Sequence, residues 1–271
     1  MHQKEKIIQK RYEGFLQTNT LWKKNAVCEL HQFEIEKKAS KISIDIDEKL
    51  RLGKYIERFV SFELKQNKSI QIISENIQIQ KEKITLGELD CILLKEKQPI
   101  HLEIVYKFYL YDASVGNSEI AHFIGPNRKD SLLEKIKKLK EKQLPLLYSK
   151  ECDSYLKNIN LNVKNIQQQV YFMGQLFMPF ASKNITLNHL DENCIAGFYI
   201  NRKELKQFEN CKFFIPVKKD WITIPHKTEN WLNYNDFVTK TDEYLTKETA
   251  PLCWLKKQNG EIEKFFLIWW S

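Results

Sequence analysis

The chain has 271 residues, 42% of them hydrophobic and 29% charged, which is enough apolar material for a folded core and excludes a disordered protein. No apolar run approaches the ~18–20 residues that span a membrane, and no apolar signal segment follows the N-terminus. We therefore expect a cytoplasmic protein with no membrane partner. The six cysteines are widely spaced, so the sequence contains no Cys-x-x-Cys zinc knuckle.

The positive charge is concentrated in the first half of the chain. Residues 1–150 contain 28 basic and 21 acidic side chains, whereas residues 151–271 contain 15 and 14. The two halves therefore carry net charges of +7 and +1. This asymmetry indicates a polyanionic partner such as nucleic acid.

Helix-spaced apolar residues predict that the first ~40 residues are helical. A second helix is predicted over about 48–66, with Asp45 or Asp47 as its N-cap. Its apolar stripe carries two glutamates, Glu57 and Glu63, on or beside it. Charged side chains seldom lie on the apolar face of a helix unless they have a partner or a function, so both glutamates are candidate site residues.

A run of strands follows this helix. Alternating or continuous apolar residues predict strands at 69–73, 77–80, 86–94, 100–111 and 170–177, with a helix over 130–143 before the last of them. Weaker strand patterns occur at 195–200, 211–217 and 221–224. A final hairpin is predicted from 253–257 and 263–270, joined by a type I′ turn at Asn259-Gly260.

The strand over 100–110 predicts two faces of different chemistry. Its even positions are all apolar or aromatic, while the odd positions include His101, Glu103 and Lys107. On the preceding strand, Glu88 and Asp90 share one face. A short turn between the two strands brings Asp90 close to Glu103, and two carboxylates at that distance favour a hard divalent cation between them. Lys107 could then orient a water nucleophile or neutralise charge on a phosphate.

These residues resemble the motifs of the PD-(D/E)XK, or restriction-endonuclease-like, nuclease superfamily, including an uncharacterised bacterial branch. Gly87-Glu88-Leu89-Asp90 is similar to its first acidic motif. The segment 101–107, His-Leu-Glu-Ile-Val-Tyr-Lys, is similar to its second acid and lysine, and Leu52-Gly53-Lys54-Tyr55-Ile56-Glu57 to its first-helix glutamate motif. One departure is the spacing: the usual Glu-x-Lys is here Glu-x-x-x-Lys, with Val105 at the lysine position.

The resemblance implies an α/β (α+β) fold: a mixed central sheet flanked by helices, with an αβββαβ core at 48–178. Residues 1–47 would then be an N-terminal helical extension and 179–271 a β-rich C-terminal region. It implies a nuclease that uses Mg²⁺ or Mn²⁺ held by Asp90 and Glu103, with Lys107 as the catalytic lysine. Glu57, or alternatively Glu63, would complete the site, and His101 and Glu88 are accessory candidates. The candidates for binding nucleic acid, with DNA favoured over RNA, are Arg128, Lys135, Lys138, Lys142 and Gln143.

Two alternatives remain open. The displaced lysine favours a catalytically inactive, nuclease-like scaffold that binds nucleic acid or a protein partner. A purely structural interpretation makes the polar strand face a protein-interaction surface, with Trp269-Trp270 as its anchor. The sequence carries no signal for an oligomeric state.

Overall fold

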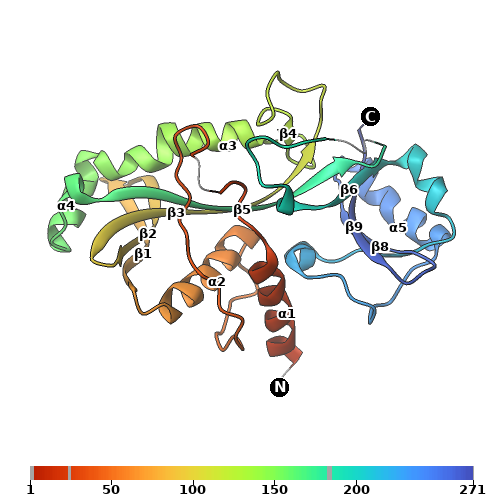
Figure 1. Cartoon of the computed structure of the whole chain (residues 1–271), viewed down its shortest axis with the longest axis horizontal. Coiled ribbons are helices and arrows are strands. Elements are labelled where there is room, and N and C mark those ends of the chain that lie inside the picture. Colours follow the sequence, from red (N-terminus) through yellow and green to blue (C-terminus); the bar gives the residue numbers. More distant parts are fainter. Residues whose placement is uncertain (1–2, 24–25, 182–184, 271) are drawn as a thin grey trace. The chain divides into compact units, whose positions relative to one another are not determined.

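The computed structural model describes residues 3–23, 26–181 and 185–270. Within these ranges the chain is a mixed α/β protein whose nine strands form one sheet (Figure 1). The strand order is β1-β2-β3-β5-β6-β9-β8-β7, with β4 paired to β3. The sheet is mixed, because β6 pairs in parallel with β5 and β9 whereas the other described pairings are antiparallel.

The strands are β1 (Ile70–Lys81), β2 (Ile84–Lys95), β3 (Gln98–Tyr111), β4 (Phe123–Ile124), β5 (Gln167–Pro179), β6 (Ile195–Asn201), β7 (Lys212–Phe214), β8 (Leu252–Lys256) and β9 (Ile262–Ile268). The α-helices are α1 (Gln3–Gln17), α2 (Leu52–Gln66), α3 (Leu132–Lys138), α4 (Lys150–Asn158) and α5 (Tyr234–Thr246). A π-helix, η1 (Leu139–Gln143), and a 3₁₀ helix, η2 (Leu144–Tyr148), continue from α3. The other 3₁₀ helices are η3 (Val163–Asn165), η4 (Glu192–Cys194), η5 (Arg202–Phe208) and η6 (Lys218–Ile222).

The chain divides into two compact units, and neither is one continuous stretch of sequence. Unit 1 comprises Met1–Asn19, Lys107–Leu132 and Gly174–Ser271; unit 2 comprises Thr20–Tyr106 and Leu133–Met173. Strands β3 and β5 contribute residues to both units. All the carboxylates selected from the sequence belong to unit 2.

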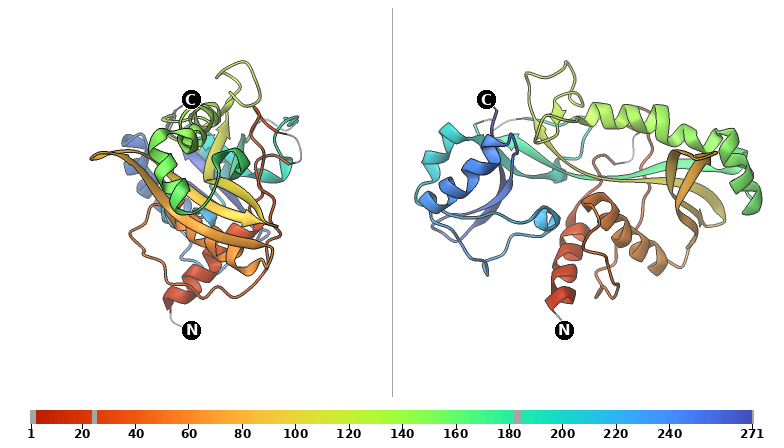
Figure 2. Two further views of the ribbon diagram at one scale, coloured as in Figure 1. Left: turned by 90° about the vertical axis from the view of Figure 1, so that its left-hand side faces the viewer. Right: turned by 180° about the vertical axis from the view of Figure 1, so that it is seen from behind.

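In unit 2 a helix, three strands, a helical region and a strand follow one another; the helical region contains α4 in addition to the one helix that the sequence predicts there. The two helices α2 and α3 lie on opposite faces of the sheet strands β1–β3 (Figures 1 and 2). Helix α2 buries Ile56, Phe59 and Val60, the stripe expected from their spacing. Because helices cover both faces of this part of the sheet, the polar odd positions at the start of β3 are buried: His101 and Glu103 are both 0% exposed.

The hairpin between β2 and β3 has the register that the short turn predicts. Glu96 and Lys97 form a two-residue turn, and both have positive φ angles, 52° and 70°. Two successive positive φ angles match a type I′ turn, whose twist suits antiparallel strands. From Lys95 opposite Gln98, the pairing runs to Cys91 opposite Leu102.

The N-terminal prediction was wrong beyond the first helix. Helix α1 ends at Gln17, and the described residues from there to Arg51 form loops that touch β5 through isolated bridges, such as Gln32 with Val170. The predicted N-caps were also wrong. Helix α2 begins later, after Arg51, which makes no side-chain cap. Asp47 instead accepts the backbone N–H of Lys49 at 2.8 Å.

Smaller corrections concern the strands. The segments 69–73 and 77–80 form the single strand β1, which accommodates Asn76 at a φ of 55°. The predicted strand at 221–224 is wrong, because η6 occupies its start. The last hairpin has no type I′ turn: Lys257 and Glu261 close a longer loop in which Gly260, at a φ of 85°, supplies the left-handed position. In the described ranges, every helix is too short or too polar to cross a lipid bilayer.

Candidate functional site

Three carboxylates from two elements converge in unit 2. Glu57 comes from α2, and Glu88 and Asp90 come from β2. One oxygen from each lies within 4.8 Å of the other two. Their side chains are 10%, 27% and 11% exposed, so the cluster is shielded from water but reachable. The convergence depends on the two strand residues sharing a face, as their spacing predicts.

Lys54 provides the cation of this cluster. Its Nζ lies 2.8 Å from Glu57 Oε2 and 3.7 Å from Asp90 Oδ1, and it also contacts Glu88. Burial alone would lower the pKa of Lys54, but hydrogen bonds to Glu57 and Glu88 raise it above its ordinary value. The side chain therefore stays an ammonium. Asn76 accepts a further hydrogen bond from it at 3.0 Å.

The sequence analysis did not select Lys54. Its spacing of three residues from Glu57 on one helix was the signal that could have identified the ion pair. The contact with Glu88 has no such signal, because it joins α2 to a strand more than thirty residues later. An exposed lysine near the start of a helix is otherwise typical of a solvated position.

Asp90 is the most perturbed acid of the cluster. Burial, together with the nearby charges of Glu103 and Glu57, raises its pKa to about 7. The backbone N–H of Ile104, donated to Asp90 Oδ2 at 2.9 Å, and the charge of Lys54 act in the opposite direction. Burial also raises the pKa of Glu57, despite its contact with Lys54. Burial is therefore the main cause of both raised pKa values, and repulsion between the carboxylates adds to it.

The donor set fits a hard divalent cation. All three groups offer carboxylate oxygens, the ligands that Mg²⁺ and Mn²⁺ prefer. With the three acids ionised, one ammonium leaves two negative charges uncompensated, which is the charge that a divalent ion neutralises. Glu57, Glu88 and Asp90 would hold such an ion.

Glu103, the other predicted ligand, lies on β3 in a separate hydrogen-bond network. Its Oε1 is 3.0 Å from His101 Nε2, and its Oε2 accepts from Gln143 Nε2 at 2.7 Å. Gln143 in turn accepts from Lys135 Nζ at 2.6 Å, and Gln168 Nε2 lies 3.0 Å from His101 Nδ1. Both carboxylate oxygens are thus fixed. The charge of Glu103 nevertheless contributes to the raised pKa of Asp90.

Gln143 reaches this network from the end of the π-helix η1. A π-turn inserts one extra residue into a helix, and such turns occur frequently at functional sites. The sequence analysis placed Gln143 and Lys135 at a phosphate. In the structure they form a chain that ends at the buried Glu103.

The remaining candidates have other surroundings. Glu63, the alternative to Glu57, accepts the backbone N–H of Lys38 at 3.0 Å and lies outside the acidic cluster. Lys107 belongs to unit 1, where its Nζ contacts Asp130 Oδ2 at 2.5 Å. Arg128, also in unit 1, contacts Asp112 at 2.9 Å and stacks on Trp270.

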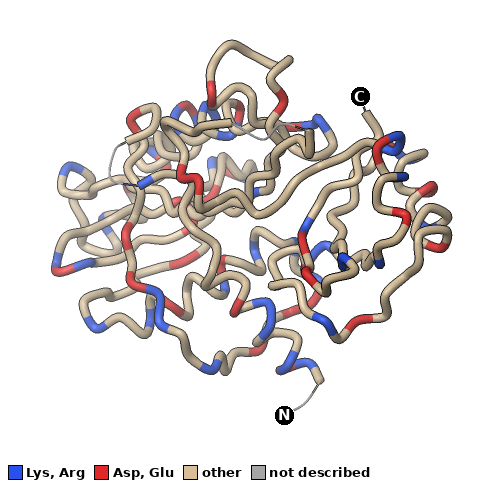
Figure 3. The backbone as a smooth tube through the Cα atoms, turned by 45° about the vertical axis from the view of Figure 1, so that its right-hand side comes forward, with Lys and Arg blue, Asp and Glu red and all other residues tan. Residues whose placement is uncertain are grey.

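The lysines of the α3–η1 segment are largely exposed. Lys138 and Lys142 face solvent, whereas Lys135 is partly buried against Gln143. Figure 3 shows basic and acidic positions interspersed along the backbone, so any basic surface is local. Exposed lysines that follow one helical segment can track a phosphate backbone without reading its sequence.

Comparison with known proteins gives one match. Residues 4–268 match the sequence profile of a family described as a domain of unknown function, DUF1853. The chain belongs to the DUF1853 family. A search of curated proteins and a search of solved structures each found no match. The description of DUF1853 names no activity, so the chemistry of this member has to be argued from the acidic cluster.

Proposed function

We propose that the chain is a divalent-metal-dependent nuclease, a hydrolase of phosphodiester bonds, with DNA as its favoured substrate. The observation that carries the proposal is the convergence of Glu57, Glu88 and Asp90 within 4.8 Å of one another. The resemblance of the same residues to PD-(D/E)XK motifs supports it, and that resemblance also favours DNA over RNA.

Each residue contributes a distinct property. Glu57, Glu88 and Asp90 supply oxygens for Mg²⁺ or Mn²⁺, which when bound would supply charge opposite the scissile phosphate and lower the pKa of a water. Lys54 adds a second positive charge beside Asp90, the place that the sequence analysis gave to Lys107. The network around Glu103 orients that carboxylate through its contacts with His101 and Gln143.

Binding of nucleic acid is assigned to exposed lysines. Lys138 and Lys142 contact phosphates without sequence preference in this proposal, since lysine is a flexible point charge. Affinity should therefore fall steeply as the salt concentration rises.

The second candidate function is an inactive scaffold that binds nucleic acid or a protein. The salt bridges of Lys54 favour it, because this ammonium already neutralises part of the charge that a metal ion would neutralise. Val105 also favours the scaffold, because it stands at the position where the superfamily has its lysine. Such a scaffold predicts binding without a metal requirement.

The deciding experiment compares wild type, Asp90→Asn and Asp153→Asn on DNA and RNA substrates with Mg²⁺, Mn²⁺ or EDTA. Asp153 is an exposed carboxylate of α4 and serves as the matched control. We expect metal-dependent cleavage by wild type and control, and loss of at least ~100-fold in Asp90→Asn. Wild-type protein that binds nucleic acid but never cleaves it under these conditions would establish the scaffold instead.

A second measurement separates a lost metal site from a lost fold. A metal that binds only the folded state raises Tm as its concentration rises. Mn²⁺ should therefore stabilise wild type and Asp153→Asn but not Asp90→Asn, with no nucleic acid present.

A further inference from the structure

Among the described residues of unit 1 is a buried lysine, Lys264, whose hydrogen-bond partners include no carboxylate. Lys264 is 7% exposed, and its Nζ donates to Gln175 Oε1 at 3.0 Å and to the carbonyl oxygen of Trp221 at 2.7 Å. Both acceptors are neutral. Burial lowers the pKa of this amine to about 7, so about half of the molecules carry a neutral amine at that pH.

The carboxylates that flank these contacts in the sequence are paired with other cations. Glu263, beside Lys264 on β9, contacts Lys257 Nζ at 2.9 Å. Asp220, next to Trp221 on η6, contacts Arg11 Nε at 2.6 Å. Neither forms an ion pair with Lys264, whose pKa shift has burial as its cause.

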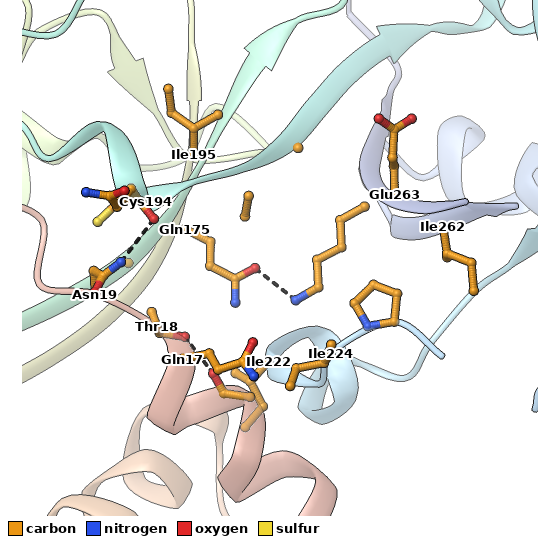
Figure 4. Close-up of a pocket in the computed structure, with 17 residues that line it drawn as sticks. Gln17, Thr18, Asn19, Gln175, Cys194, Ile195, Ile222, Ile224, Ile262 and Glu263 are labelled. Atoms are coloured by element: carbon orange, nitrogen blue, oxygen red, sulfur yellow. Dashed lines mark hydrogen bonds between the residues drawn. The ribbon is translucent and has the colours of Figure 1, made fainter. Parts of the chain in front are cut away.

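Lys264 lines a pocket of about 500 Å³ whose walls belong wholly to unit 1. Figure 4 shows Gln175 extending into this pocket, with a dashed line marking its hydrogen bond to Lys264, and Thr18 and Ile222 on the walls. Much of the remaining wall is small or apolar, including Ala196 and Gly197. A volume of this size admits a small organic molecule.

Two glycines fix the backbone on either side of the amine. Gly197 of β6 lies opposite Lys264 of β9, and a Cβ there would come within 2.0 Å of the Lys264 carbonyl oxygen. Gly14 of α1 lies against η6, where a Cβ would come within 1.9 Å of the Ile222 carbonyl oxygen. Close backbone packing therefore holds both β9, which carries Lys264, and η6, whose Trp221 carbonyl oxygen accepts the hydrogen bond of the lysine.

The hydrogen bonds match a neutral amine. Such an amine has two N–H groups, and Gln175 and Trp221 provide two acceptors. With both N–H groups donated, the position left over on Nζ is the lone pair, and Lys264 is one of the residues that line the pocket. A desolvated lysine with a free lone pair is the usual nucleophile toward carbonyl compounds.

We propose that the unit 1 pocket binds a small aldehyde or ketone and that Lys264 forms a Schiff base with it. The Nζ lone pair adds to the carbonyl carbon, and a proton moves from nitrogen to oxygen to give a carbinolamine. That oxygen takes up a proton from solvent and leaves as water when the C=N bond forms, so the product is a protonated imine and the step needs no oxidant or reductant. The protonated imine keeps one N–H for Gln175 or Trp221. The site is independent of the acidic cluster in unit 2.

The test treats the full chain with propionaldehyde and sodium cyanoborohydride near pH 7, then measures modification of each lysine by peptide mass spectrometry. An ordinary lysine is neutral in roughly one molecule in 2,500 at that pH. We expect Lys264 to be modified at least ~10-fold faster than the exposed Lys206 and Lys240, and its rate to level off above pH 8.

Two controls keep this test decisive. In concentrated guanidinium chloride the preference for Lys264 should vanish while Lys240 still reacts, and Lys264→Met should lose only that modified peptide. Modification of native Lys264 no faster than that of Lys240 would overturn the proposal. So would protection of Lys264 by acetate without any trapped adduct, since that result would make the pocket an anion site.

Discussion

The carboxylate of Asp90 accepts the backbone N–H of Ile104 at 2.9 Å, just beyond the last paired residues, Cys91 of β2 and Leu102 of β3. A side chain thus replaces a backbone carbonyl in holding the two strands together. Because Oδ2 is used in this way, Oδ1 is the oxygen that lies 3.7 Å from Lys54 Nζ. Asp90 therefore links the sheet to the acidic cluster.

The raised pKa of Asp90 predicts a pH-dependent stability. The folded carboxyl titrates at about 7 and the unfolded one near 3.8, so between these values the folded state binds the extra proton. The free energy of unfolding should fall as the pH rises through that window, by up to about 1.4 kcal/mol per pH unit from this group. In Asp90→Asn the contribution is absent. Urea unfolding of both chains from pH 5 to 8 measures it; a difference that stays constant with pH would contradict the prediction.

Lys54→Met removes the ammonium from the acidic cluster. We expect metal-free stability at pH 8 to fall by about 1 kcal/mol, since the side chain is partly exposed. We also expect Mn²⁺ to raise Tm more than in wild type, because nothing then competes with it for the carboxylates. Lys65→Met, on the same helix but 63% exposed, is the matched control. An equal Mn²⁺ shift in all three chains would argue against competition.

Gln143→Leu tests the network around the buried Glu103. The substitution leaves Glu103 Oε2 without its donor in a 0% exposed position. We expect a loss of about 2–3 kcal/mol in the free energy of unfolding, because an uncompensated buried charge is costly. Lys142→Leu, the exposed neighbour, should cost less than about 0.5 kcal/mol. Similar losses in both variants would show that the π-helix, rather than the hydrogen bond, is what matters.

The exposed lysines of the α3–η1 segment predict a salt effect. Lys138→Ala with Lys142→Ala should weaken DNA binding and reduce the slope of log K against log salt by about 2. Fluorescence anisotropy at several salt concentrations measures the slope. Lys206→Ala with Lys240→Ala, exposed positions of unit 1, removes the same charge elsewhere. If both double variants change the slope equally, the segment is not a specific contact.

The lowered pKa of Lys264 predicts a pH dependence of the free energy of unfolding that is opposite in sign to that of Asp90. Its pKa is about 7 in the folded state against 10.5 for the ordinary side chain, so the unfolded state binds more protons between these values. Wild-type stability should therefore rise relative to Lys264→Met as the pH increases from 7 to 9, by up to about 1.4 kcal/mol per pH unit. Thermal or urea unfolding at paired pH values detects it. Parallel profiles for the two chains would mean that the lysine is solvated.

The fold of unit 2 follows largely from local patterns in the sequence. The stripe of Ile56, Phe59 and Val60 repeats at helix spacing, and β2 and β3 are long apolar runs separated by charged turn residues. The loops after α1 could not be predicted from local sequence patterns. Trp22 and Phe33 are fully buried there, and their burial is achieved by packing on β5, which lies far along the chain.

The site was predictable only in part. Parity along a strand put Glu88 and Asp90 on one face, and the structure has them together with Glu57. The role of Lys54 depends on an approach of helix to strand that no local pattern encodes. The hydrogen bond from Gln143 to Glu103 comes from the end of a π-helix, which has no recognised sequence signature.

The two-residue turn at Glu96-Lys97 determines which residues of β3 lie beside Asp90 of the acidic cluster. Asp90 lies five residues before the last residue of β2, or about 17 Å along the strand, and its partner on β3 is set by counting from that turn. One residue inserted between Glu96 and Lys97 would shift the count by one and present a carboxylate and an apolar side chain on the wrong faces. Variation in length at this exposed hairpin tip would therefore separate chains that keep Ile104 and Glu103 beside Asp90 from chains that have lost these neighbours.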